Sequence, residues 1–173
     1  MEKTQSQYSK EYIVEALFAL MKKENFTNIS VADICKKAGV SRATYYRYFK
    51  TKKDVIIAFF RYNLERYLEA ISKYDKRDYR NNTYEFFKNF KENEEQLIIS
   101  EKNNLLYYYM ECITLYFAKS YRQKFGDDKV ELSYIYSGAV YNYSIWWLNT
   151  GFEKSIDEVV DDFIACFHIN NNY

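Results

Sequence analysis

Residues 26–55, FTNISVADICKKAGVSRATYYRYFKTKKDV, decide the fold because they contain three helix starts separated by short turns. Ser30 and Asp33 form a capping-box pattern, which predicts a short helix that reaches about Ala38. Gly39 then permits the left-handed turn that a tight reversal between two helices requires. The segment therefore predicts two short helices that meet at a glycine.

Further helices are predicted on both sides of this turn. Ser41 caps a third short helix that ends near Phe49, and Thr51 with Asp54 forms a second capping box that opens a long fourth helix. Upstream, apolar residues recur at helical spacing over Ser9–Glu24, which predicts a first helix. A three-helix unit with a glycine turn before its third helix is typical of a helix-turn-helix.

The rest of the chain is also predicted to be helical. It contains no proline, only four glycines, and no sustained alternation of apolar and polar residues at period two. The expected later helices lie near 82–99, 103–125, 129–150 and 155–168. We therefore predict an all-α fold in which a helix-turn-helix domain at 1–54 precedes a helical domain at 55–173.

Composition excludes a membrane protein and a disulfide-rich secreted domain. Charged residues make up 28% of the chain, and apolar runs such as Val55–Phe60 and Ile145–Leu148 are far shorter than the ~20 residues that span a bilayer. The polar N-terminus predicts no signal peptide. Cys35, Cys112 and Cys166 are too widely spaced for a disulfide framework or a zinc site, so a cytoplasmic location fits best.

Charge is unevenly distributed along the chain. Residues 1–53 carry 11 Lys/Arg and 5 Asp/Glu, a net charge of +6, whereas residues 54–173 carry 14 and 19, a net charge of −5. The asymmetry is compatible with a basic module that faces a polyanion, and equally with a chance pattern of solvated charges. Charge alone does not decide between these two interpretations.

The third helix divides into a core face and an exposed face. Tyr45 and Phe49 share one side of the helical wheel and are expected in the core. The side chains expected to project outward are Arg42, Ala43, Thr44, Tyr46, Arg47 and Tyr48. Arginine can donate two hydrogen bonds to guanine, a threonine methyl can touch thymine, and tyrosine hydroxyls suit phosphates. The exposed face therefore suits the major groove of DNA.

The same stretch resembles the DNA-binding signature of the TetR/AcrR family of transcriptional regulators. The matching parts are Phe26, Ser30-Val31, Asp33-Ile34, Ala38-Gly39-Val40-Ser41, Thr44, Tyr46, Tyr48-Phe49 and Lys52. The resemblance is strong over about residues 9–60. One departure is Asn25, where members often have glycine, but asparagine tolerates the left-handed conformation.

The resemblance implies a fold of about nine helices and a homodimeric regulator, usually a repressor that leaves a palindromic operator when it binds a small molecule. By position, the residues expected on phosphates are Ser30, Tyr46, Tyr48 and Lys52. The residues expected on base edges are Arg42, Ala43, Thr44 and Arg47. Ala32, at the start of the second helix, would lie close to the DNA backbone. Each could instead be an ordinary solvated surface residue.

The larger helical domain is expected to bind an apolar or aromatic effector and to dimerise. The candidate liners of a pocket are Tyr84, Phe86, Phe87, Phe90, Tyr107, Tyr108, Tyr109, Met110, Tyr116 and Phe117. The candidate dimer stripes are Leu132, Tyr136, Ala139, Val140, Tyr143 and Trp147, and Ile156, Val159, Val160, Phe163, Ile164 and Phe167. Packing within one chain is an equal alternative for these stripes.

An enzyme is not expected, because no glycine-rich phosphate loop, nucleophile elbow or HExxH pattern occurs. No cofactor or metal is expected either, since His168 is the only histidine and lacks neighbouring ligands. Two other functions remain open. The chain could be a coactivator or adaptor whose C-terminal domain binds a protein, or a helical protein that has lost DNA binding.

Overall fold

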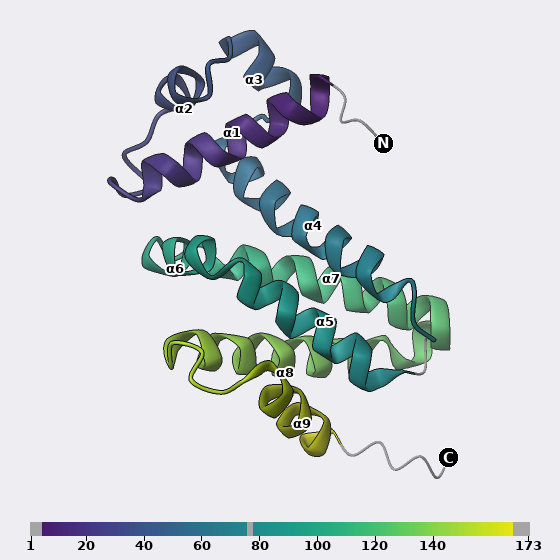
Figure 1. The fold of residues 1–173 in the computed structure, drawn as a ribbon. Coiled ribbons are helices and arrows are strands. Elements are labelled where there is room, and N and C mark those ends of the chain that lie inside the picture. The colour runs from purple at the N-terminus through teal and green to yellow at the C-terminus, as the bar shows by residue number, and fades with distance from the viewer. Residues whose placement is uncertain (1–4, 76–77, 168–173) are drawn as a thin grey trace. The chain divides into compact units, whose positions relative to one another are not determined.

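The computed structural model describes residues 5–75 and 78–167, and within these residues all regular secondary structure is helical (Figure 1). The elements are α1 (Gln5–Met21), α2 (Val31–Ala38), α3 (Arg42–Tyr48), α4 (Lys52–Ile71), α5 (Tyr79–Glu92), α6 (Glu94–Lys102), α7 (Leu106–Phe125), the short 3-10 helix η1 (Asp127–Lys129), α8 (Val130–Asn149) and α9 (Ile156–Cys166). The predicted all-α fold is confirmed.

The chain packs as two compact units, each with its own core. Unit 1 contains Met1–Arg61 and Glu95–Tyr109, and unit 2 contains Tyr62–Glu94 and Met110–Tyr173. Helices α4 and α7 are each continuous, and each contributes residues to both units (Figure 1). The chain therefore passes between the units inside regular helices as well as through the turn between α5 and α6.

The helix-turn-helix forms because its local signals are satisfied. The backbone N–H of Ser30 donates to Asp33 Oδ2 over 2.9 Å, and the N–H of Asp33 donates to Ser30 Oγ over 3.2 Å. Gly39 ends α2 with φ 67°, and its N–H donates to the carbonyl of Cys35. The predicted capping box and left-handed turn are both confirmed, and together they set the start and the end of α2.

Helix α3 is fixed by its N-cap and by two aromatic side chains. The N–H of Thr44 donates to Ser41 Oγ over 3.0 Å, which caps the first turn. Tyr45 and Phe49 are buried, as predicted, and their ring centroids lie 5.9 Å apart. They join the buried apolar side chains of unit 1, which include Ile13, Leu17, Met21, Phe26, Ile34, Val55, Ile56 and Phe60. Because these side chains pack on one side of α3, the opposite side of the helix is exposed to solvent.

A second segment completes unit 1. The turn between α6 and α7 buries Leu105 and Leu106, and the ring of Tyr109 lies 5.4 Å from that of Phe60. The sequence predicted one helix over 82–99, and this prediction is wrong. The helix ends at Asn93, whose side-chain amide donates to the carbonyl of Asn89 over 2.7 Å. Because neither glycine nor proline marks this break, periodicity did not reveal it.

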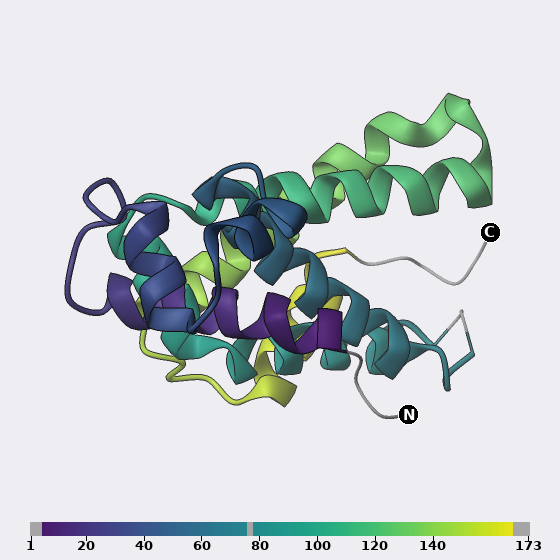
Figure 2. The ribbon, with the colours of Figure 1, turned by 90° about the horizontal axis from the view of Figure 1, so that it is seen from above.

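Unit 2 is built around aromatic rings from α5, α7, α8 and α9. The ring of Phe87 on α5 meets those of Tyr143, Trp147 and Phe163 edge to face, at 5.5–5.9 Å between centroids. Helices α7 and α8 lie side by side, joined by the turn that contains η1 (Figure 2). Most of the apolar volume of α9 and of one face of α8 is therefore used within the chain.

Helix α8 carries large apolar side chains on both of its faces. Its buried face combines Val140, Trp147 and Leu148 with three fully buried serines, Ser133, Ser137 and Ser144, and its exposed face also carries large apolar side chains. The exposed residues are Leu132, Tyr134, Ile135 and Trp146. The predicted dimer stripes are corrected accordingly, because five of their members are buried within unit 2. These are Val140, Trp147, Val159, Val160 and Phe163.

Among the described residues, no helix is both long and apolar enough to cross a membrane. In the same part of the chain, no group of histidine, cysteine, aspartate and glutamate side chains could hold a metal ion. His168, the only histidine of the sequence, lies outside the described residues.

Candidate nucleic-acid interface

Helix α3 presents a continuous exposed face. Arg42, Ala43, Tyr46 and Arg47 are exposed, and Tyr46 keeps 55% of its surface accessible. Thr44 and Tyr48 are half-buried at the edges of this face. The structure thus places six of the nine predicted DNA-binding residues on one short helix, and four of the six are exposed.

The cations around α3 lack acidic partners. Arg42, Arg47, Lys50 and Lys53 are exposed, and none forms an ion pair with another described residue. Cations of unit 2 are instead neutralised locally. The pairs there include Arg66–Glu92, Arg80–Asp157, Arg122–Asp127 and Lys154–Asp162. The surface around α3 therefore retains positive charge that can bind a polyanion.

Two predicted polar contacts are already engaged within the protein. The hydroxyl and backbone N–H of Ser30 both donate to Asp33, which lowers the pKa of the Asp33 carboxyl. The hydroxyl of Thr44 lies 3.0 Å from that of Ser41. Ser30 must therefore exchange a partner before its hydroxyl can donate to a phosphate, whereas the Thr44 methyl remains independent of this bond. Ala32 is half-buried near the start of α2.

Lys52 has a structural role that its sequence position did not reveal. Its ammonium donates to the carbonyls of Phe26, Thr27 (3.0 Å) and Ile29 (2.8 Å), and it lies 4.6 Å from the centroid of the Phe26 ring. Lysine has three N–H donors, so these carbonyls use all of them. Partial burial lowers the pKa of Lys52. In this arrangement Lys52 ties the start of α4 to the turn between α1 and α2.

Sequence reasoning missed a contribution from α1. The ammonium of Lys10 lies 5.5 Å from the centroid of the Tyr48 ring, so the first half of α1 borders the end of α3. Tyr8 and Tyr12 on the same helix are exposed, with their rings stacked at 6.4 Å. The signal available in the sequence was the placement of these residues opposite the buried Ile13 and Leu17.

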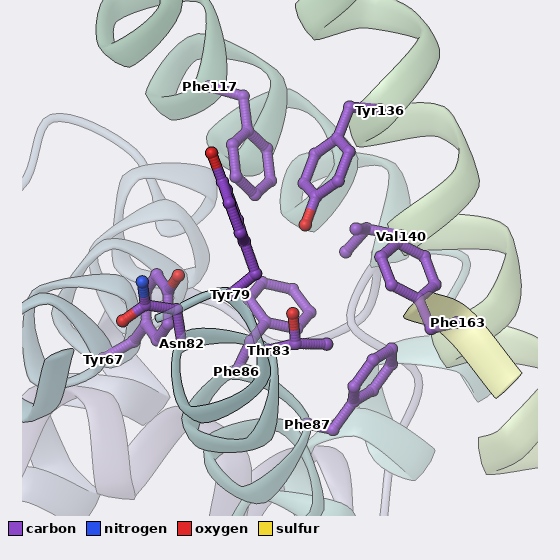
Figure 3. Close-up of a pocket in the computed structure, with 10 residues that line it drawn as sticks. All are labelled: Tyr67, Tyr79, Asn82, Thr83, Phe86, Phe87, Phe117, Tyr136, Val140 and Phe163. Carbon is purple, nitrogen blue, oxygen red and sulfur yellow. The ribbon is translucent and has the colours of Figure 1, made fainter. Parts of the chain in front are cut away.

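Unit 2 contains a small cavity with aromatic walls (Figure 3). Its volume is about 50 Å³, and it is lined by Tyr67, Tyr79, Asn82, Thr83, Phe86, Phe87, Phe117, Tyr136, Val140 and Phe163. Of the pocket residues predicted from sequence, three line this cavity, namely Phe86, Phe87 and Phe117. Tyr107, Tyr108 and Tyr109 belong to unit 1 instead.

The cavity is polar at some points but uncharged. None of its ten lining residues carries a charged side chain. The Oδ1 atom of Asn82 is buried without a hydrogen-bond partner. Burial raises the pKa of the Tyr136 hydroxyl, and a hydrogen bond with Thr83 opposes that rise. An occupant would therefore meet apolar rings, one unsatisfied acceptor and no counter-ion.

Comparison with known proteins identifies relatives of the first unit. Residues 13–59 match the model of the family described as bacterial regulatory proteins, tetR family. The chain is also 30% identical over 61 residues to the fatty acid metabolism regulator protein of Bacillus subtilis (strain 168). That match covers 35% of this chain and 31% of the relative, so the similarity spans less than a third of the relative's length. The predicted resemblance of the N-terminal region is confirmed.

Solved structures share the fold over nearly the whole chain. Lin0861 from Listeria innocua aligns with a TM-score of 0.79 at 16% identity, over 96% of this chain and 93% of its own. A TetR transcriptional regulator from Streptococcus agalactiae 2603V aligns at 0.63 and 15%, over 94% of each chain. The fatty acid degradation regulator FadR from Bacillus halodurans aligns at 0.58 and 17%, over 100% of each. At these identities the alignments establish the fold.

The Lys52→Met variant tests the structural role of this lysine. Methionine keeps an unbranched apolar side chain but removes every donor, which leaves the Phe26 and Ile29 carbonyls without their charged partner. We expect a loss of about 2 kcal/mol in the free energy of unfolding, measured by urea denaturation. Lys53→Met, which alters an exposed neighbour, should change that free energy by less than about 0.5 kcal/mol. Equal stability of the two variants would contradict the role.

Proposed function

Because the chain carries the N-terminal domain of the tetR family of bacterial regulatory proteins, we propose that it is a homodimeric transcriptional repressor. It binds a palindromic operator in double-stranded DNA and leaves it when a small apolar or aromatic ligand binds. Residues 1–54 bind DNA, and residues 55–173 sense the ligand and dimerise. The protein works in the cytoplasm, where bacterial operators lie.

The observation that carries this proposal is the unpaired basic face of α3. Arg42 and Arg47 read base edges together with Ala43 and Thr44, and Tyr46 stands at the border of the same face. Phosphates are held by Tyr46 and Tyr48, by Ser30 after exchange of its partner, and by backbone near Ala32. The internal bonds of Lys52 favour a positioning role over the phosphate contact expected from its position.

A second copy of the chain is the best candidate to cover the exposed face of α8. This face places in solvent the large apolar side chains of Leu132, Tyr134, Ile135 and Trp146. An exposed apolar stripe of this kind is unfavourable in water and is typical of an interaction surface. A two-fold dimer covers it on both protomers at once, and for its two copies of α3 to meet one face of a duplex they must lie about one DNA turn, ~34–36 Å, apart.

The cavity of unit 2 is proposed as the effector site. Its uncharged aromatic lining favours an apolar ligand, and two relatives are named for fatty acid metabolism or degradation, which fits a lipophilic compound. At about 50 Å³ the cavity is well below the ~300–1,000 Å³ of ligand pockets, so binding requires the rings to separate. Tyr79 is 42% exposed and is the lining residue best placed to move.

The small cavity also favours one competing function. A regulator without room for an effector could respond to a protein, in which case unit 2 of this chain would act as an adaptor or coactivator surface. The exposed apolar side chains of α8 would then contact that protein. Both functions keep the DNA-binding face of α3 and differ only in what unit 2 recognises.

DNA recognition is tested by selecting duplexes from a random pool and measuring affinity against ionic strength. We expect Arg42→Ala and Arg47→Ala each to weaken the selected duplex by about 1–3 kcal/mol and to relax base preference. Lys53→Ala is the matched control, because it removes a flanking charge and should weaken all sequences alike. If both arginine variants lose equally on selected and random DNA, the assignment of base contacts is wrong. No wild-type binding at low salt would refute the function.

The proposed dimer is tested with Ile135→Glu. This change places a charge at the centre of the exposed apolar face of α8, where Ile135 is 64% exposed in one chain. We expect sedimentation at micromolar concentration to show a dimer for the wild type and a monomer for the variant, with little change in helicity. Tyr62→Glu alters another exposed aromatic residue and should remain dimeric. A monomeric wild type would contradict the proposal.

The effector site is tested by thermal unfolding with three probes, namely a long-chain fatty acid, a neutral aromatic compound and a cationic aromatic compound. Binding to the folded state raises the unfolding temperature, by an amount equivalent to ~2.7 kcal/mol at a hundredfold excess over Kd. We expect neutral or acyl probes to act and the cation not to. Val140→Phe, which fills the cavity, should abolish the rise. If no probe acts and a specific protein co-purifies, the adaptor function is favoured.

A further inference from the structure

The cavity of unit 2 contains a hydrogen-bond acceptor that the protein leaves unsatisfied. Asn82, in the first turn of α5, lines the cavity (Figure 3), and its Oδ1 atom is buried without a hydrogen-bond partner among the described residues. All ten lining residues belong to unit 2. A buried oxygen that has left water without gaining a donor costs free energy, so an occupant that brings a donor to this atom recovers that cost.

Other polar groups at the cavity already have partners. The Tyr136 hydroxyl points from α8 toward α5 (Figure 3) and shares a hydrogen bond with Thr83. The backbone N–H of Asn82 donates to the carbonyl of Asp78 over 3.0 Å. Of the buried side-chain oxygens and nitrogens that line the cavity, Oδ1 of Asn82 is the one without a partner in the part of the chain that the structure describes. It is therefore the atom that fixes where the polar group of a ligand lies.

The rest of the wall favours a flat aromatic body. The rings of Tyr67 and Phe86 lie 5.5 Å apart and those of Phe117 and Tyr136 lie 4.8 Å apart, both edge to face. Rings in this arrangement offer faces and edges against which a further aromatic ring packs well. Because the cavity volume is about 50 Å³, a single small ring needs less displacement of the wall than a long acyl chain.

The electrostatics of the cavity select a neutral polar group. No lining residue carries a charged side chain, so an ammonium or a carboxylate would lose its hydration without meeting a counter-ion. A carboxylate would also bring only acceptors to an oxygen that needs a donor. A neutral O–H or N–H group meets both conditions.

We propose that the cavity binds a small neutral aromatic compound that carries an O–H or N–H donor, as phenols do, and that Oδ1 of Asn82 accepts this donor. The inference rests on the proposed effector site and adds to it the polar group by which the site selects its ligand. A ligand with a donor restores the hydrogen bond of any water that it displaces from Oδ1, whereas an apolar ring of the same size does not. Sites with a buried polar atom discriminate strongly between such ligands.

Phenol and toluene are a matched pair of probes, because they share one shape and differ only in a hydroxyl in place of a methyl group. Calorimetric titration of the full chain without DNA gives both dissociation constants. The apolar contribution alone favours toluene, which has more apolar surface. We nevertheless expect the wild type to bind phenol at least about tenfold more tightly, because the phenol hydroxyl satisfies Oδ1.

Asn82→Leu removes the acceptor and keeps a side chain of similar size. We expect this variant to bind toluene at least as tightly as phenol. Asn89→Leu is the matched control, because it makes the same substitution about two turns further along α5, at a residue that does not line the cavity. This control should keep the preference for phenol. If Asn82→Leu does not fold, Asn82→Ala removes the same acceptor and should lose the same preference.

The remaining outcomes separate this inference from the proposed function. If the wild type binds toluene as tightly as phenol, or if Asn82→Leu still prefers phenol, the assignment to Asn82 is overturned and the cavity remains the effector site. Phenol binding that survives in Val140→Phe also overturns it, because the probe then lies elsewhere. If neither probe binds, the inference is wrong, and a rise in unfolding temperature with a long-chain fatty acid would leave the effector site standing for another ligand.

Discussion

The Lys52 ammonium donates hydrogen bonds to three backbone carbonyls. These bonds join the start of α4 to the segment that leads into α2. The segment of eight residues between α1 and the cap of α2, residues 22–29, exposes carbonyls that no helix satisfies, and a single charged side chain binds three of them. The donor stands at the first position of α4, so the same bonds fix both the entry to α2 and the start of the long helix. Without them, the caps at Ser30 and Ser41 would still form helices but would not orient them.

Local signals explain why so much of this region could be predicted from sequence. The capping boxes, the left-handed glycine and the polarity of α3 each depend on residues no more than five positions apart. Their energetics are set before any tertiary contact forms, so the pattern of Ser30, Asp33, Gly39 and Ser41 specified the boundaries of α2 and α3 closely. The core positions of Tyr45 and Phe49 followed from the same periodicity.

Features that depend on distant partners could not be predicted. The Phe26 N–H donates to Oδ1 of Asn103, 77 residues away, and the partners of Lys52 lie 23–26 residues away, so neither role has a local pattern. On α8 periodicity did not separate the two faces, because serines are buried beside Val140 and Trp147 while Leu132 and Ile135 stay exposed. Ser137, for example, meets the hydroxyl of Thr114 on α7 over 3.1 Å. The sequence left two surfaces open for the apolar stripe of α8, and packing within the chain is the one observed for Val140 and Trp147.

The distribution of paired and unpaired charges separates the roles of the two units. In unit 2 cations such as Arg80 and Lys154 bind nearby carboxylates, and these exposed pairs add little stability but neutralise the cations that form them. Around α3, acidic side chains serve as helix caps instead, as Asp33 and Asp54 do, and Arg42 and Arg47 form no ion pair with any residue that the structure describes. A basic surface whose cations have no carboxylate partners keeps a positive potential, and this potential attracts polyanions. The cap of α2 also ties up its own polar groups, because Asp33 accepts hydrogen bonds from both the backbone N–H and the hydroxyl of Ser30, and any other acceptor has to compete with this carboxylate.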